Sequence, residues 1–259
     1  IYILLIMEFD KNGILNRAKA AQQSAAVMDE GLRAYMLKVY NYMGAGVLLT
    51  GIFAVITFKI STVTNDSGML VGLTSFGNTI YNSGFKWLVV LAPIVPFFMF
   101  MTGMRKMSSS KAKSLFWIFS ALWGLSLSSL LLLYTGASVA RVFFITSATF
   151  GTMSIYGYTT KRDLTKLGSF CIMGLVGIII ASLVNIFMQS PMMYFVISIL
   201  GVLIFVGLTA YDTQKIKNMY SPSDSGEIIS KKAVMGALTL YMDFINLFIF
   251  LLRIFGQRR

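Results

Sequence analysis

Seven long apolar segments constrain this chain more than any other feature. A helix that crosses the hydrocarbon layer of a membrane needs about 17–25 predominantly apolar residues. Helices are favoured there because they satisfy all their backbone hydrogen bonds internally. The sequence therefore predicts an all-α integral membrane protein with seven transmembrane helices, at about residues 35–58, 87–104, 114–134, 139–158, 167–188, 192–211 and 233–255.

Basic residues are distributed unevenly between the two sides of the membrane that this topology defines. Sixteen of the 22 Lys and Arg residues fall in the N-terminal region and in the loops after the second, fourth and sixth segments. Because basic loops stay in the cytoplasm, we expect a cytoplasmic N-terminus and an external C-terminus. Residues 1–34 then form a cytoplasmic leader and residues 35–259 the transmembrane domain. The basic tail "GQRR" leaves one alternative open, six spans with a re-entrant last helix.

Rare and missing residue types exclude several classes of function. The chain has no histidine and a single cysteine, Cys171. Histidine-ligated zinc, serine–histidine–aspartate catalysis and cysteine-based metal sites are therefore excluded. The net charge of +12 lies mainly in loops on one side of the membrane, which argues against a nucleic-acid-binding surface. We expect a protein whose partner is the lipid bilayer, with no enzymatic activity and no tightly bound cofactor.

The seventh segment carries an aspartate, Asp243, near its middle. A charge there costs about 2.5–3.5 kcal/mol even on lenient insertion scales, and such residues usually face the interior of a helix bundle. Gly236, Thr239, Asp243 and Asn246 recur at spacings of three and four, so they form one small and polar stripe on the helix. We expect Arg253, ten residues further on, to anchor the helix at the outer headgroup level rather than to pair with Asp243.

A second carboxylate, Asp212, ends the sixth segment. Two carboxylates that share a partly desolvated site could hold a proton near neutral pH, titrate as a unit and bind calcium when ionised. At ~1.5 Å per residue, however, Asp243 lies roughly 10–16 Å below the membrane boundary at which Asp212 is expected. The two meet only if the sixth helix is tilted or deeper than its hydropathy indicates. In the alternative, Lys215 caps an interfacial Asp212 and neighbouring polar groups bond Asp243.

Small residues and prolines predict how the helices pack. Small residues at helical spacing permit close approach between helices in lipid, and proline interrupts a helix because it has no N–H group to donate. The predicted seams are Ser120, Gly124 and Ser128, then Gly174, Ala181 and Asn185, then Gly44 and Gly51, and the predicted kink is at Pro93 and Pro96.

Three motifs resemble those of one known family. The stretches "SIYGYTTKRDLTKLGSF", "GLTAYDTQKIK" and "ALTLYMDFINLFIFLLRIFG" are similar to the Bax inhibitor-1 family of membrane proteins, in its proteobacterial branch. The similarity runs from about Tyr35 to Gly256. It implies a bacterial inner-membrane protein in which two three-helix layers enclose a central seventh helix. It also implies a pH-sensitive calcium leak governed by two aspartates, which by motif match are Asp212 and Asp243.

The sequence departs from the pattern of that family at one position. A leak of this kind is closed by an arginine on the second helix that pairs with the aspartate of the sixth, and here the second segment has no charge before Arg105. Similar bacterial proteins are also associated with membrane-protease quality control. The alternative function is therefore a regulatory protein that binds a membrane protease through its cytoplasmic face and leader.

Two other classes of seven-helix or aspartate-bearing membrane protein fit the residues poorly. Intramembrane aspartyl proteases carry Gly-x-Gly-Asp where this chain has "LYMD", and their Pro-Ala-Leu element is absent here. A retinal-binding protein needs a Schiff-base lysine inside the last helix, and residues 233–252 contain none.

Overall fold

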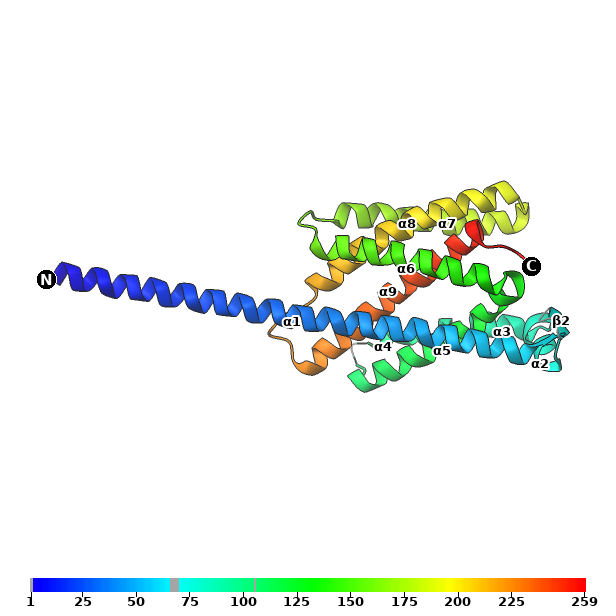
Figure 1. Ribbon diagram of the computed structural model, residues 1–259, viewed down its shortest axis with the longest axis horizontal. Helices are drawn as coiled ribbons and strands as arrows, with labels where there is room; N and C mark the ends of the chain where they lie inside the picture. Colours follow the sequence, from blue (N-terminus) through cyan, green and yellow to red (C-terminus); the bar gives the residue numbers. More distant parts are fainter. Residues whose placement is uncertain (1, 66–69, 105) are drawn as a thin grey trace.

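The computed structural model describes the backbone of residues 2–65, 70–104 and 106–259, and the side chains of these ranges from residue 29 onward. Nearly all of the described chain is helical (Figure 1). The elements are α1 (Tyr2–Ser61), β1 (Thr62–Thr64), β2 (Leu70–Leu73), α2 (Ser75–Gly77), the π-helical turn η1 (Asn78–Asn82), α3 (Phe85–Leu91), α4 (Ile94–Gly103), α5 (Ser109–Leu133), α6 (Gly136–Thr159), α7 (Thr165–Met188), α8 (Pro191–Asn218) and α9 (Gly226–Phe255).

Seven stretches of helix in the described chain are long and apolar enough to cross a membrane, which confirms the predicted all-α membrane fold. They are Asp29–Ser61, Phe85–Gly103, Ser109–Leu133, Gly136–Thr159, Thr165–Met188, Pro191–Asn218 and Gly226–Phe255. The last of them is one continuous helix, and its C-terminal end lies opposite the N-terminus of the chain (Figure 1). The re-entrant alternative for the seventh segment therefore finds no support in the described chain.

The second span is divided where its prolines predict. Helix α3 ends at Leu91, and α4 begins at Ile94, after Pro93. Neither Pro93 nor Pro96 has an N–H group to donate to the preceding turn. The backbone compensates locally, since the N–H group of Val95 donates to the carbonyl oxygen of Ala92 at 3.3 Å.

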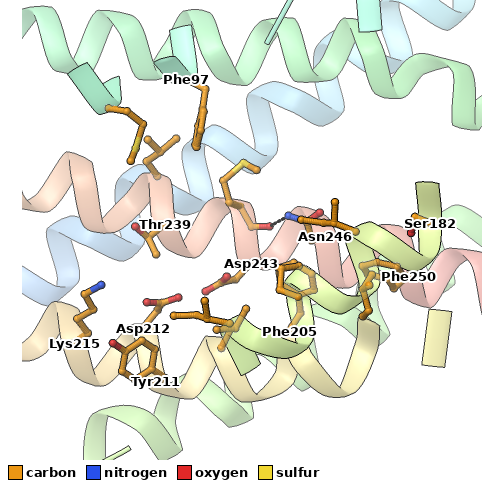
Figure 2. A pocket seen from close by; sticks show the side chains of 18 of the residues that line it. Phe97, Ser182, Phe205, Tyr211, Asp212, Lys215, Thr239, Asp243, Asn246 and Phe250 are labelled. Atoms are coloured by element: carbon orange, nitrogen blue, oxygen red, sulfur yellow. Dashed lines mark hydrogen bonds between the residues drawn. The ribbon is translucent and has the colours of Figure 1, made fainter. Parts of the chain in front are cut away.

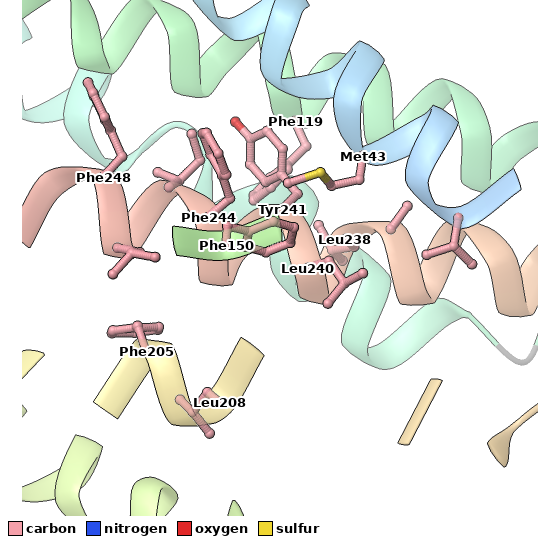
Figure 3. Packing of buried hydrophobic residues seen from close by; sticks show 14 of the residues in the cluster. Met43, Phe119, Phe150, Phe205, Leu208, Leu238, Leu240, Tyr241, Phe244 and Phe248 are labelled. Atoms are coloured by element: carbon pink, nitrogen blue, oxygen red, sulfur yellow. The ribbon is translucent and has the colours of Figure 1, made fainter. Parts of the chain in front are cut away.

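Helix α9 is the central element of the bundle. In its most apolar 18-residue window 72% of the residues are buried, against 44% or less in each of the other six spans. It packs against α1, α5, α6 and α8, and its aromatic residues interlock with those helices (Figure 3). Phe244, for example, lies edge-on to Phe143 and Phe150 of α6. A central, buried seventh helix is thus observed, whereas the grouping of the other six into two layers stays a prediction.

The loops divide between two ends of the bundle. We call the end that carries residues 106–108, 160–164 and 219–225 the basic end, and the other the opposite end. At the basic end lysine ammonium groups donate to backbone carbonyl oxygens near the C-terminal ends of helices, where cations are favoured. These bonds join Lys217 to Tyr158 (2.8 Å), Lys231 to Met107 (3.2 Å) and Lys232 to Met219 (2.7 Å).

At the opposite end the C-terminal tail is tied to the turn between α5 and α6. The N–H group of Thr135 donates to the carbonyl oxygen of Gln257, and that of Arg259 to Leu133, both at 3.0 Å. The segment between the first two spans, predicted as a polar loop, contains the antiparallel hairpin of β1 and β2. From there Tyr81 reaches the bundle, where its hydroxyl lies 2.8 Å from that of Ser128.

Helix α8 is longer than its hydropathy predicts. It was expected to end at Tyr211 but continues to Asn218, so Asp212 lies inside the helix and not at its end. Its last turns are polar, and they are held by Gln214, whose side chain accepts from the N–H group of Leu164 at 2.8 Å and donates to the carbonyl oxygen of Arg162 at 2.7 Å. The apolar part of the segment ends before Lys215 and Lys217, whereas the helix continues through both lysines.

Small residues form some of the predicted seams but not all. Gly124 lies so close to α1 that an added Cβ would be 2.5 Å from the carbonyl oxygen of Thr50, and Gly174 packs against Ile204 of α8. The seam predicted at Gly44 and Gly51 is wrong, because an added Cβ at either position would meet no atom within 4 Å. In α1 it is Gly46 that packs closely, against Phe116 of α5.

The N-terminal part of α1 projects well beyond the bundle as a continuous helix (Figure 1). The predicted leader, residues 1–34, therefore has no break from the first span in the described backbone. Three of its four basic residues, Lys11, Arg17 and Lys19, lie outside the described side chains, as does Arg105, whereas Arg33 is described. The role of this segment as a leader stays a prediction.

Candidate functional site

The two predicted aspartates line the same cavity. This cavity has a volume of about 680 Å³ and is bounded by α4, α7, α8 and α9. Asp212 enters it from α8 and Asp243 from α9 (Figure 2), and Thr239 and Asn246 of the predicted polar stripe also line it. We call it the aspartate cavity. The structure thus brings together all four residues that the sequence singled out.

Asp243 is buried, with 4% of its surface exposed. It is the third residue of the polar stripe, on the helix that is most fully surrounded by protein. Its Oδ2 atom is buried and has no hydrogen-bond partner among the described residues. An ionised carboxylate in this environment would be strongly destabilised, because nothing around that oxygen replaces its water.

Asp212 lies opposite Asp243, and the two carboxyl groups point toward each other in the cavity (Figure 2). Residue counting predicts that the two aspartates lie at different depths, and two features of the fold remove this difference. Helix α8 continues six residues past Asp212, which sets this carboxyl about 9 Å inside the helix end at ~1.5 Å per residue. Helix α9 has 30 residues and runs obliquely through the bundle, so Asp243 lies less deep than its position in the sequence indicates (Figure 1).

Thr239 and Asn246 face the cavity but are bonded to their own helix. The Thr239 hydroxyl donates to the carbonyl oxygen of Met235 at 3.2 Å, and the Asn246 amide donates to that of Met242 at 2.8 Å. The Thr239 hydroxyl proton and an Asn246 amide proton are therefore used within α9, and the side-chain oxygens of both residues remain available to the cavity. In the described chain the stripe therefore does not supply the missing donor to Oδ2 of Asp243, which is what the structural alternative for that residue required.

The aspartate cavity has a cation at each end. Lys215 lies three residues after Asp212 at the basic end, and Arg253 lies at the opposite end. From Met235 to Arg253 the cavity follows α9 for eighteen residues, or ~27 Å, which approaches the roughly 30 Å thickness of a bilayer's hydrocarbon layer. The cavity is therefore elongated along α9, and the two carboxyl groups lie between its ends.

The environment of Arg253 is compatible with an anchoring role and includes two aromatic rings. Its guanidinium group lies 5.1 Å from the ring centroid of Tyr194 and 5.2 Å from that of Phe250. Cations are attracted to aromatic faces at such distances. Within the described chain Arg253 forms no ion pair with Asp243. That it anchors α9 at the headgroup level stays a prediction.

The wall contributed by the second span is apolar. Helix α4 lines the cavity with Phe97 and Met101, and neither carries a charge. Arg105 is outside the described residues. The arginine that the family resemblance placed on this helix thus has no counterpart among the described lining residues of α4.

Sequence reasoning missed the hydroxyl chain that supports α8 from behind. The hydroxyl of Tyr40 lies 2.6 Å from that of Ser154, which lies 2.9 Å from that of Thr213. This chain joins α1, α6 and α8 next to Asp212. Serine and threonine side chains often hydrogen-bond between membrane helices, but nothing in the spacing of these three residues indicates that they meet.

The site offers few ligands to a metal ion. No group of three or more His, Cys, Asp or Glu side chains is found among the residues that the structure describes. Calcium takes six to eight oxygen ligands, and two carboxyl groups supply four at most. With neutral oxygens from Thr239 and Asn246 and with water, the pair could hold calcium in transit, not as a resident ion.

Comparisons with known proteins agree on one family. The family model described as "Inhibitor of apoptosis-promoting Bax1" matches residues 32–259. The chain is 47% identical over 231 residues to the protein RP147 of Rickettsia prowazekii (strain Madrid E), which covers 89% of this chain and 92% of that protein. It is 43% identical to the inner membrane protein YbhL of Escherichia coli (strain K12), over 88% of this chain and 94% of that protein. A Borreliella burgdorferi protein is 45% identical, over 87% and 92%.

Proposed function

Since the chain belongs to the Bax inhibitor-1 family of membrane proteins, we propose that it is a calcium leak of the bacterial inner membrane whose flux depends on pH through Asp212 and Asp243. The observation that carries this proposal is the pair of facing carboxyl groups that line one cavity elongated along α9. Transport rather than catalysis is the function that this geometry supports best.

The aspartate cavity has properties that suit a weak ion pathway. Conduction requires that an ion bind well enough to enter and weakly enough to leave. Two carboxylates with neutral oxygens beside them attract a hard cation without enclosing it. The cations at the two ends, Lys215 and Arg253, oppose the passage of calcium, which agrees with a slow leak in place of rapid conduction.

The carboxyl pair supplies a reason for sensitivity to pH. Two carboxyl groups within hydrogen-bonding reach bond directly when one proton lies between them. Such a proton removes the repulsion between like charges and lowers the cost of burying Asp243. Protons and calcium then compete for the same oxygens, so calcium flux depends on pH as a property of the pair.

Liposomes that enclose a calcium-sensitive dye test the proposal. Wild-type protein is expected to admit calcium faster than empty liposomes, and Asp243→Asn is expected to change that flux. Asp163→Asn is the matched control, because Asp163 is exposed in the loop between α6 and α7 and does not line the cavity. Flux in the wild type no greater than in empty liposomes would overturn the proposal.

A second candidate function rests on a different observation, the helix that projects from the bundle. The N-terminal part of α1 extends beyond the basic end (Figure 1) and offers a surface to another protein. We propose that it binds a membrane-bound quality-control protease if the leak is absent. Co-purification of the endogenous membrane proteases with the full chain, and its loss when residues 1–28 are deleted, would support this function.

Both functions require the basic end to face the cytoplasm, as the distribution of Lys and Arg residues predicts. A reporter fused after Arg259 is then expected to be active only outside the cytoplasm. Reporter activity confined to the cytoplasm would contradict the predicted orientation.

A further inference from the structure

A second cavity at the basic end lies between α1 and α6 and shares no lining residue with the aspartate cavity. It has a volume of about 600 Å³, and its lining is mostly apolar. Leu37 and Met43 of α1 and Ile155 of α6 contribute to it, together with Gly151. An added Cβ at Gly151 would meet no atom within 4 Å, so this glycine borders open space and not a neighbouring helix.

The depth of the cavity matches one leaflet of a bilayer. Along α1 it extends from Arg33 to Met43, ten residues or ~15 Å. Half of the roughly 30 Å hydrocarbon layer is the same length. One lipid acyl chain therefore fits the cavity from the headgroup level to the middle of the bilayer.

The mouth of this cavity carries a cation, Arg33, that forms no ion pair among the described side chains, although Asp29 and Glu30 precede it by one turn on α1. Arg33 lines the mouth and is exposed. Lys232–Asp224 is the only ion pair among the side chains that the structure describes, so Arg33 has no carboxylate partner there. A second cation lies near this mouth. The ammonium group of Lys217 is 5.1 Å from the ring centroid of Tyr158, which lines the cavity.

A comparison within the molecule shows that this charge is specific to one leaflet. A third cavity, of about 460 Å³, lies toward the opposite end between α1, α5, α6 and α9. Its described lining residues are apolar apart from Thr50, and none is charged. The two cavities follow the same pair of helices, but only the one at the basic end combines an apolar slot with a free cation.

We propose that the cavity between α1 and α6 binds an anionic phospholipid from the leaflet at the basic end. The lipid phosphate lies at Arg33, and one acyl chain lies in the slot beside Gly151. Basic pockets between membrane helices on the cytoplasmic side, which the basic end is predicted to face, bind anionic headgroups. The site is separate from the aspartate cavity, so the inference does not depend on calcium flux.

Native mass spectrometry of the purified full chain tests the site with phosphatidylglycerol and phosphatidylcholine of identical acyl chains. The wild type is expected to retain phosphatidylglycerol about fivefold better, the effect of one cation at headgroup level. Arg33→Gln is expected to abolish this preference and leave the unfolding temperature in lipid-free detergent unchanged. Arg258→Gln, at the opposite end, is the matched control and should keep the preference.

A second pair of variants tests the acyl-chain slot. Gly151→Leu is expected to fill the open space and to reduce the retention of both lipids severalfold, in a protein that still unfolds cooperatively. Gly51→Leu makes the same change in the third cavity, where an added Cβ also meets nothing within 4 Å, and should leave retention unchanged. Equal preference for phosphatidylglycerol in wild type and Arg33→Gln would overturn the proposal. So would a Gly151→Leu protein that binds lipid normally but loses self-association, since the occupant would then be a second copy of the chain.

Discussion

Replacing Gly157 by alanine tests how closely α6 and α8 are packed behind Asp212. An added Cβ at Gly157 would collide with the carbonyl oxygen of Ala210 and come within 2.9 Å of its Cα atom. These are backbone atoms in the middle of a helix, so they cannot move aside as the end of a flexible side chain does. The two helices would have to separate, and overpacking of this kind typically costs about 1–3 kcal/mol.

The assay is thermal unfolding of the purified protein in detergent, followed by tryptophan fluorescence. At about 2–4 °C per kcal/mol for a chain of this size, Gly157→Ala is expected to lower the unfolding temperature by about 2–12 °C. Gly177→Ala in α7 is the control. An added Cβ there meets no atom within 4 Å, and alanine is the better helix former by about 1 kcal/mol.

The control is therefore expected to unfold at the same temperature as the wild type or higher. If Gly157→Ala were as stable as Gly177→Ala, the close contact between α6 and α8 would be refuted. The position of Asp212, which follows Ala210 by two residues on α8, would then need another explanation.

Three further predictions concern other parts of the molecule. Tyr241→Phe removes the 2.7 Å hydroxyl contact with Thr50 and is expected to cost about 0.6–1.7 kcal/mol, measured by thermal unfolding. Asp163 accepts hydrogen bonds from the N–H group and hydroxyl of Thr165, and these hold the pKa of Asp163 below its ordinary value. A depressed pKa contributes stability above the unfolded-state pKa of about 3.9 that is lost as pH falls through the folded-state pKa. The difference in unfolding temperature between wild type and Asp163→Ala should therefore shrink below about pH 4, and a constant difference down to pH 2 would contradict this. Arg253→Leu is expected to leave the pH response of calcium flux unchanged, and a change as large as that of Asp243→Asn would show that Arg253 does more than anchor α9.

The spans and the central helix follow from simple properties of the sequence. Apolar length fixes the number of crossings, and the polar stripe through Asp243 identifies the helix that must be shielded from lipid. The kink at Pro93 follows from the missing N–H group. In each case a single residue type has a strong local effect, which neighbouring helices do not override.

Other features depend on contacts between helices that no local pattern records. Hydropathy ends the sixth helix at Tyr211, because the following turns are polar. The helix continues because Gln214 ties those turns to the loop after α6 and Lys217 ties them to the last turn of α6. Gly46 and Gly51 look equivalent in sequence, yet only Gly46 packs against α5. Which face of a helix meets a neighbour is decided by the whole bundle.

The candidate site illustrates the same division. Each aspartate was predicted from its own helix, and a motif match placed the two together. Their meeting depends on the length of α8 and the oblique course of α9, neither of which a residue count gives. The aspartate cavity itself, with walls from α4 and α7, could not be predicted, because it is the space that four helices leave between them.

The most direct test of the central claim is calcium flux into liposomes measured from pH 5 to pH 8 for four proteins. These are the wild type, Asp212→Asn, Asp243→Asn and the double variant, each compared with empty liposomes. If the two carboxyl groups act as one unit, the wild type shows a single pH transition that either substitution removes, and each single variant resembles the double variant. Independent and additive effects of the two substitutions would contradict a shared site.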